Sequence, residues 1–257
     1  MGLCNDQSVT FLRGLGYNVV RHPTAALKPL DLIGVQNGES NYLGPLNLLI
    51  TKPPTDLPKI QTDIPAADVN GQKSSKLSIG IGVNILGAVI GAMGGNLGLD
   101  LSYTDAKRLE FQYTGVLNDQ AVPLEVGNYL REGEVDAGNL ILKQYVLGNG
   151  KLFLVTKTAK SKKFTVSFEK SNGSAATVNV PLIQGAVGGK IEIKAEGQYK
   201  HILSFEGPQP LVFGFQNYQV GVKDGNLALT SSQAGATYLS ATGNTLLEGE
   251  GLLDLRR

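Results

Sequence analysis

The chain has 257 residues, which is long enough for one large domain or two small ones with a substantial core. Only 18% of the residues are charged, 33 are glycine and none is tryptophan, a composition that favours a β-rich protein over a helical bundle. The net charge of +1 gives no electrostatic argument for nucleic-acid binding, so we expect no nucleic-acid partner. The single cysteine, Cys4, excludes an internal disulfide and fits a reducing cytoplasm. No apolar segment of the secretion-signal type follows Met1, so we expect no export by that route.

The first 75 residues predict short strands separated by turns. Apolar runs predict strands at 17–21, 30–36 and 46–51. Pro23 is expected to end the first strand, and Asn37-Gly38 is a strong hairpin-turn signal after the second. Residues 52–75 contain four prolines among polar residues, which predicts a loop across the surface.

Residues 77–99 form a run of 23 uncharged residues, seven of them glycine. The length suits a transmembrane helix, and glycines at 87, 91 and 95 could pack such a helix against a neighbour. At both ends, however, apolar residues alternate with small or polar ones, as in a strand with one face toward lipid. These alternating positions are Leu77, Ile79, Ile81, Val83, Ile85, Leu97, Leu99 and Leu101. Three interpretations stay open: a buried soluble helix between strands, a segment that switches into a transmembrane β-hairpin, and a membrane helix.

The middle of the chain is less distinctive. Leu109, Phe111 and Tyr113 continue the alternation and predict one more strand. Residues 125–135 predict a short exposed helix, and 140–147 are ambiguous between helix and strand.

A second block of alternation follows the turn at 148–150. Its candidate membrane-inserting positions are Phe164, Val166, Phe168, Val178, Val180, Leu182, Ile191 and Ile193. An ordinary half-solvated antiparallel sheet would show the same pattern. Four lysines between 157 and 163 predict an exposed link, either a solvated turn or a contact for anionic headgroups. Pro208 and Pro210 predict that residues 205–222 form short, interrupted strands.

The C-terminal tail has more apolar residues than a free terminus needs. Its leucines are Leu246, Leu247, Leu252, Leu253 and Leu255, and we expect them to dock on the body as autoinhibitory contacts. Residues 231–244 are small, polar and glycine-containing, which is typical of an exposed and cleavable connector. No Lys or Arg occurs between Asn226 and Leu255, so we expect an activating protease that reads a small or apolar residue between about 231 and 247.

Motifs for catalysis or metal binding are not found in the sequence. The two histidines, His22 and His201, lie far apart and without neighbouring cysteines or clustered carboxylates. There is no serine-hydrolase elbow, and the phosphate-loop-like stretch at 185–190 has Gln184 and Ile191 at positions that the motif reserves for other residues. We therefore expect neither an enzyme nor a bound cofactor or metal. Gly2 suggests myristoylation, but Asp6 breaks that motif, and Cys4 is left as a packed residue or an acylation site.

Several segments together resemble the bacterial gasdermins. They are CNDQSVTFLRGLGYNVVRHP at 4–23, LKPLDLIGV at 27–35, the glycine-rich 77–103, NYLREGEVD at 128–136 and LFLVTKT at 152–158. The resemblance covers essentially the whole chain in order and length, although no single motif in it is as specific as a metal-ligand set.

The resemblance implies a fold that agrees with the many short alternating runs. That fold is α+β, with a twisted, mainly antiparallel central sheet and helices around it, in a body of residues 1–237. Residues 238–257 would be a C-terminal autoinhibitory peptide with a cleavable linker before it.

The resemblance also implies a function in antiphage defence. A partner protease would remove the tail, and the body would then oligomerise with bacterial inner-membrane or anionic lipids. Two regions would refold into hairpins of a large transmembrane β-barrel, and the cell would die. The protein would be a cytoplasmic monomer at rest, with palmitate on Cys4. The linker has no protease motif that we recognise. The alternatives are a soluble β-rich binding module without membrane activity and, last, an enzyme of unfamiliar type.

Overall fold

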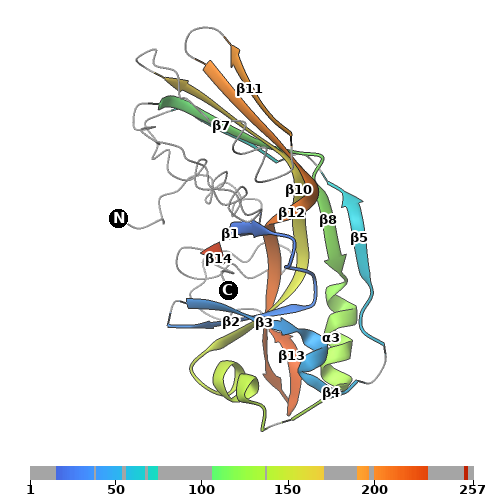
Figure 1. The fold of residues 1–257 in the computed structure, drawn as a ribbon. Coiled ribbons are helices and arrows are strands. Elements are labelled where there is room, and N and C mark those ends of the chain that lie inside the picture. Colours follow the sequence, from blue (N-terminus) through green and yellow to red (C-terminus); the bar gives the residue numbers. More distant parts are fainter. Residues whose placement is uncertain are drawn as a thin grey trace.

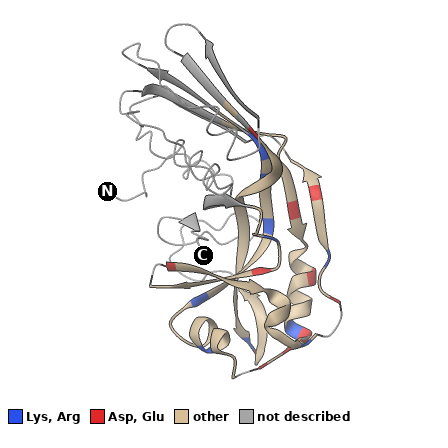
Figure 2. Ribbon diagram, viewed as in Figure 1, with Lys and Arg blue, Asp and Glu red and all other residues tan. Residues whose placement is uncertain are grey.

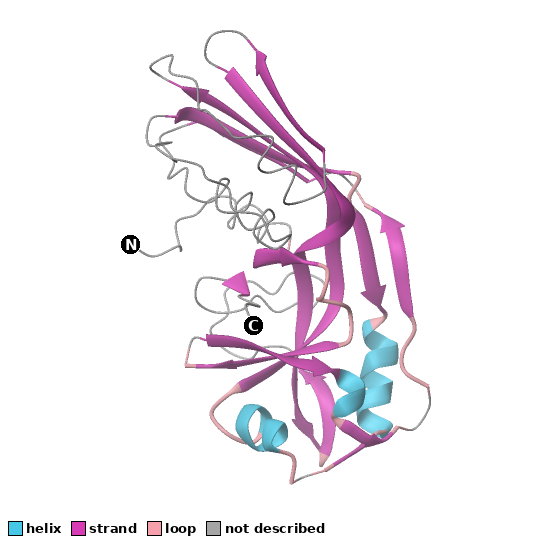
Figure 3. Ribbon diagram, viewed as in Figure 1, coloured by secondary structure: helices cyan, strands magenta, loops and turns pink. Residues whose placement is uncertain are grey.

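The computed structural model describes residues 16–37, 39–53, 56–66, 69–74, 106–136, 138–170, 190–196, 200–230 and 252–253. Strands dominate this part of the chain (Figure 3). Twelve strands form one sheet, and all of its pairs are antiparallel except the pairing of β14 (Leu252–Leu253) with β1 (Asn18–Thr24). The predicted α+β architecture with a mainly antiparallel sheet is confirmed.

Two long strands run through the centre of this sheet. They are β10 (Lys151–Lys170) and β12 (Lys200–Lys223), and they pair with each other along most of their length. The sheet order is β14-β1-β12-β10-β2-β3, with β2 at Asp31–Gln36 and β3 at Glu39–Pro45. Figure 1 shows both long strands bending midway, so that one half of the sheet leans away from the other.

We call the leaning half the arm. It consists of β6 (Val69–Ser74), β7 (Ala106–Thr114), β11 (Lys190–Glu196), residues 163–170 of β10 and residues 200–206 of β12. The rest of the described sheet is the body. It includes β5 (Ile60–Pro65), β8 (Leu117–Ala121) and the hairpin strand β13 (Asn226–Thr230). A separate pair joins β4 (Ile50–Lys52) to β9 (Glu134–Val135).

Both faces of the sheet are buried in the body. Leu152 and Leu154 of β10 belong to one core cluster, and Phe153 and Val155 belong to another. Successive residues of a strand point to opposite faces, so this run of apolar residues serves two cores. Helix α3 (Pro123–Glu132) covers the face with Leu152 and Leu154. It buries Val126, Tyr129 and Leu130, whose spacing places them on one face of the helix.

The expected short helix near 125–135 and the expected strand at 109–113 agree with α3 and β7. The ambiguous residues 140–147 are helical, with a π-helical turn η4 at Leu142–Val146. The Asn37 turn between β2 and β3 also agrees, because Asn37 has a φ of 53°, which hairpin turns of this type require.

Three expectations for the first 75 residues are wrong. Pro23 does not end the first strand, because β1 continues through it to Thr24, and Pro23 lies within the register shift between Val19 and Thr24. Residues 46–48 form a 3₁₀ turn, η2 (Leu46–Leu48), in place of a strand, because Leu46, Leu49 and Ile50 are buried together at helical spacing. The expected loop at 52–75 contains β5 and β6. Strand β5 pairs only with β8 among the described strands and ends at Pro65, and such an edge strand tolerates both proline and polar residues.

Candidate functional site

The candidate site is built on one edge of β10, which changes partner twice. Residues 151–154 pair with β2, residues 157–160 pair with β8, and residues 163–170 pair with β7. Strands β8 and β7 therefore lie end to end along β10. Between them, Gly115 has a φ of +61°, a conformation that favours glycine and lets the chain turn from one strand into the next.

The other edge of β10 has three register shifts against β12, between residues 155 and 163. We call this region, with residues 206–217 of β12, the bend. The largest shift lies between the pairs Ser161–Leu211 and Lys163–Glu206, where β10 has one unpaired residue and β12 has four. The four residues of this bulge, 207–210, include both Pro208 and Pro210.

Two predictions about this region are therefore wrong. The prolines do not interrupt β12, because they lie in a bulge, where a strand loses no ladder hydrogen bond to a missing N–H. The lysine-rich residues 157–163 are part of a continuous strand and do not form a link.

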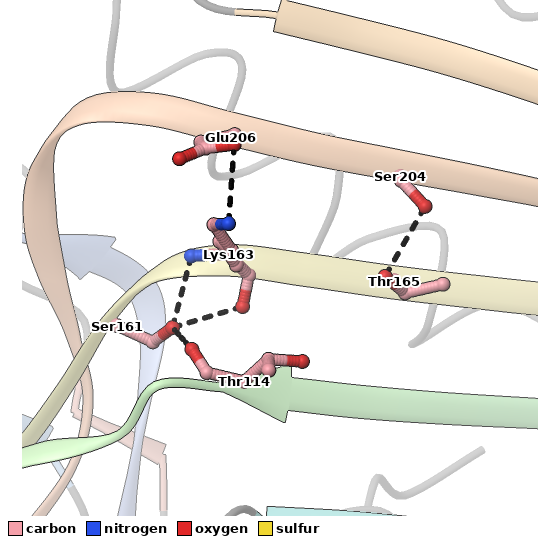
Figure 4. A network of polar contacts seen from close by, with 6 residues as sticks. All are labelled: Thr114, Ser161, Lys163, Thr165, Ser204 and Glu206. Atoms are coloured by element: carbon pink, nitrogen blue, oxygen red, sulfur yellow. Dashed lines mark hydrogen bonds and ion pairs between the residues drawn. The ribbon is translucent and has the colours of Figure 1, made fainter.

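Ser161 connects β10 to β7 at the bend through hydrogen bonds of its hydroxyl (Figure 4). Its hydroxyl accepts a hydrogen bond from the Lys163 N–H at 2.9 Å. The same hydroxyl lies 2.7 Å from the Thr114 carbonyl of β7 and 2.9 Å from the Lys163 carbonyl, and it can donate a hydrogen bond to either of them. Further along the arm, Thr165 and Ser204 join β10 to β12 through their hydroxyls at 3.2 Å.

Lys160 forms a charge cluster at the same place. Its Nζ lies 2.7 Å from Asp119 Oδ2 of β8 and 2.9 Å from Asp63 Oδ1 of β5. The Lys160 and Asp119 side chains are each only 13% exposed, and Asp119 also accepts a hydrogen bond from the Asp63 N–H at 2.8 Å. One lysine thus joins three strands.

The other lysines of this stretch have different surroundings. Lys157 Nζ lies 5.8 Å from the centroid of the Tyr17 ring, and Lys163 pairs with Glu206 at 3.4 Å. Lys162 is exposed. In Figure 2 basic positions follow the bend, and acidic positions lie on neighbouring strands. The sequence left two roles open for these lysines, a solvated turn or a contact with lipid headgroups. In this structure Lys160 has a different role, because it forms intramolecular ion pairs with Asp119 and Asp63.

The arm arranges apolar residues in rows across four strands. One row contains Tyr113, Phe164, Phe205 and Ile191, and the next contains Phe111, Val166, Leu203 and Ile193. Directly paired residues share a face of the sheet. The intervening row contains Gln112, Thr165, Ser204 and Glu192, so apolar and polar rows alternate.

Five of the predicted insertion residues are brought together in this way: Phe164, Val166, Phe168, Ile191 and Ile193. Strand β12 lies between β10 and β11. The predicted positions 164–168 and 191–193 are therefore on strands that are not direct neighbours. The sequence reasoning did not assign Leu203 and Phe205 of β12 to the site, although their alternation with Ser204 and Glu206 is the same signal.

The remaining predicted site residues lie outside the described residues. They are Cys4, Leu77, Ile79, Ile81, Val83, Ile85, Leu97, Leu99, Leu101, Val178, Val180, Leu182, Leu246, Leu247 and Leu255.

The tail contributes one described element. Leu252 pairs with Val19, and Leu253 pairs with Val20, as two parallel strands. Val20 is 1% exposed and belongs to the core cluster that also contains Val155 and Phe215. The end of the chain thus extends the central sheet by one strand next to β1.

Within the described ranges, no helix has both the length and the hydrophobicity to cross a bilayer. Among the same residues, no group of three or more His, Cys, Asp or Glu side chains is close enough to hold a metal ion.

Comparisons with known proteins agree with one another. A sequence profile described as the Bacterial Gasdermin Family matches residues 20–230. A protein named Gasdermin bGSDM from a Vitiosangium species is 45% identical, with 99% of each chain covered. Another Gasdermin bGSDM, from a Desulfuromonadales bacterium, is 34% identical and covers 96% of this chain and 93% of its own. The solved structure of a bacterial gasdermin from Bradyrhizobium tropiciagri has the same fold, with a TM-score of 0.59 at 19% identity, over 96% of this chain and 94% of its own.

Proposed function

Since this chain belongs to the bacterial gasdermin family, we propose that it is an autoinhibited pore-forming protein of antiphage defence. Gasdermins are pore-forming effectors and not enzymes, so the chain acts by assembling in a membrane and not by turnover of a substrate. Removal of the C-terminal peptide by a protease releases the body, which oligomerises in the inner membrane and kills the cell.

The observation that carries this proposal is the amphipathic arm. Four of its five strands, β7, β10, β12 and β11, already pair in the resting chain and already alternate apolar and polar rows, as a membrane-crossing strand requires. Because β10 and β12 continue from the body into the arm, insertion would extend existing strands and would not need a new pairing. Residues 77–104 would supply the second hairpin, between β6 and β7 in sequence.

The pairing of β14 with β1 supports the role of the tail as the brake. Burying one leucine is worth about 1.5–3 kcal/mol, so several of the five tail leucines together could hold the resting state. Cutting the linker between about 231 and 247 lowers the effective concentration of the tail, and the tail then dissociates. The body would be residues 1–237, and residues 238–257 would be the autoinhibitory peptide, with the cleavable linker before it.

The proposal includes two interactions with the membrane. Palmitate on Cys4 would add to membrane affinity, at roughly 0.8 kcal/mol per buried methylene. Bacterial inner-membrane or other anionic lipids would receive the inserted strands. Intact mass before and after hydroxylamine tests the thioester, and Cys4→Ala with unchanged toxicity would show that acylation is dispensable.

Dye release from liposomes tests the proposal. A site for a specific protease is inserted in the linker between 231 and 247, and the protein is assayed uncut and cut. We expect no dye release from liposomes with the uncut protein and rapid release with the cut protein. The alternative is a soluble β-rich binding module, and it predicts no release in either case. Equal lysis by uncut and cut protein would remove the tail from its role as the brake.

A further inference from the structure

Strand β1 is the described element through which the tail reaches the sheet. Among the described strands, β14 pairs with β1 alone, and β1 pairs on its other side with β12. Neither β10 nor any strand of the arm pairs with β14. Through the described pairings, a signal from the tail to the arm therefore has to pass through β1.

Strand β1 lies on the bend. Asn18 pairs with Phe215 and Val19 pairs with Gly214, and the register then shifts so that Thr24 pairs with Val212. On its opposite edge, this part of β12 has one of the register shifts toward β10, between Gly214 and Val212. Gly214 allows the close contact, because a Cβ at this position would lie 3.3 Å from Tyr17 Cβ. Strand β1 thus pairs with residues 212–215 of β12, which are the part of the bend next to the body.

Tyr17, which directly precedes β1, and Asn18, its first residue, have side chains that contact three other strands. The Tyr17 hydroxyl donates to Asn118 Oδ1 of β8 at 3.4 Å, and its ring lies below Lys157 of β10. Asn18 donates from Nδ2 to Asn217 Oδ1 of β12 at 3.3 Å, and both residues are fully buried. Burial also raises the pKa of the Tyr17 hydroxyl, so it remains a neutral donor. The strands that these two residues contact, β8, β10 and β12, are those that meet at the bend.

We propose that β1 is an inner lock between the tail and the arm, and that activation has two ordered steps. The tail leaves first, and β1 thereby loses one of its two described strand partners. Strand β1 then separates from β12 and releases the bend. This inference rests on the proposed pore-forming function, and it adds the element that has to move after the cut.

A disulfide between β1 and β12 tests the order of these steps. Thr24 and Val212 are direct partners in an antiparallel pair, a geometry that a disulfide can bridge. The variant Thr24→Cys with Val212→Cys is prepared in the chain that carries the engineered linker site. Peptide mapping verifies that the disulfide joins 24 to 212 and leaves Cys4 free. The two single-cysteine variants are the controls.

After the cut, the oxidised double variant should lose its tail peptide and yet release dye about tenfold or more slowly than the cut parent. A reductant should restore its release to the level of the single-cysteine controls. If the oxidised variant loses its tail and lyses as fast as the parent, the inner lock is wrong while the proposed function stands. If the cut parent itself is silent, the proposed function fails.

Hydrogen exchange on the unmodified sequence gives a second measurement if the double variant does not fold. The amides of Arg21, His22 and Thr24 lie beyond the two residues that pair with β14, and Pro23 between them has no amide hydrogen. In the cut protein, without membranes, these amides should exchange about tenfold faster than in the uncut protein. Equal protection before and after the cut would overturn the proposal.

Discussion

Lys160 holds the bend through charge, and its removal would leave two carboxylates without their cation. Asp119 is only 13% exposed on its side chain, so its charge would be poorly solvated in a Lys160→Met variant. We expect the free energy of unfolding of the uncut protein to fall by about 1–3 kcal/mol, measured by urea denaturation.

The exposed neighbour Lys162 provides the matched control. Lys162→Met should change stability by no more than about 0.5 kcal/mol. The swap of Lys160→Asp with Asp119→Lys should recover part of the loss. Equal stability of the Lys160→Met and Lys162→Met variants would show that the cluster contributes nothing.

Asp31 gives the body a pH dependence. Burial raises the pKa of this carboxyl, although hydrogen bonds from the Lys28 N–H at 2.7 Å and the Tyr42 hydroxyl at 3.3 Å, together with the Lys28 charge, act in the opposite direction. A raised pKa means that the folded state binds a proton more readily than the unfolded state, so Asp31 costs stability as the pH rises through its folded pKa. Asp31→Asn keeps an oxygen acceptor and removes the charge.

The Asp31→Asn variant should therefore be more stable than the parent at neutral pH, and the difference should shrink toward a pH of about 4. Urea denaturation at several pH values measures this difference. A variant that is less stable than the parent at neutral pH would mean that the partners of the ionised form outweigh its burial.

Two glycines distinguish packing from backbone effects in the elements of the body. A Cβ at Gly34 of β2 would lie 2.6 Å from the Tyr145 ring, so Gly34→Ala should destabilise the protein by about 1–3 kcal/mol. A Cβ at Gly127 in the middle of α3 would meet nothing within 4 Å, so Gly127→Ala should stabilise it by about 0.5–1 kcal/mol. Thermal unfolding of both variants measures these effects. Stability changes of the same sign in the two variants would contradict the different surroundings assigned to the two glycines.

The elements that the sequence predicts well are those whose pattern is local. Helix α3 has a buried face at helical spacing, β7 alternates, and Asn37 marks its turn. The length of β10 and β12 could not be predicted. The lysines at 157–163 and the prolines Pro208 and Pro210 are residues that usually mark the end of a strand. Only their partners show otherwise: Asp119 and Asp63 neutralise Lys160, and the bulge accepts both prolines.

The candidate site was predictable in part for a similar reason. Alternation identified the apolar positions of β10 and β11, since periodicity belongs to a single strand. The position of β12 between them depends on a pairing across the chain, which no local pattern contains. The same holds for the polar edge strands β5 and β6, whose residues become strands because β8 and β7 offer them hydrogen bonds.

Substitutions on the two faces of the arm should have different effects on the membrane activity of the cut protein. Val166 lies in an apolar row, and Ser167 lies in the adjacent row with Glu110. Val166→Asp would place a carboxylate on the lipid face at a cost of about 2 kcal/mol in every subunit, so dye release by the cut protein should be lost. Ser167→Asp, one residue away, should reduce release much less.

Thermal unfolding of the uncut forms is the control for this comparison, because both variants must first fold. Equal loss of dye release in the two folded variants would mean that the rows seen in the resting arm are not the faces of the inserted strands.

The unequal number of residues at the bulge has a consequence for the shape of the molecule. Between the same two cross-strand pairs, β12 has three more residues than β10, roughly 10 Å of extended chain. Two paths of different contour length between shared end points cannot both be straight, so the curvature is set by residue count and is independent of side-chain identity. Deleting residues 208–210 leaves one residue on each path and should lengthen the molecule, which small-angle X-ray scattering measures as a larger maximum dimension. An unchanged dimension would assign the curvature to the side chains packed around the bulge.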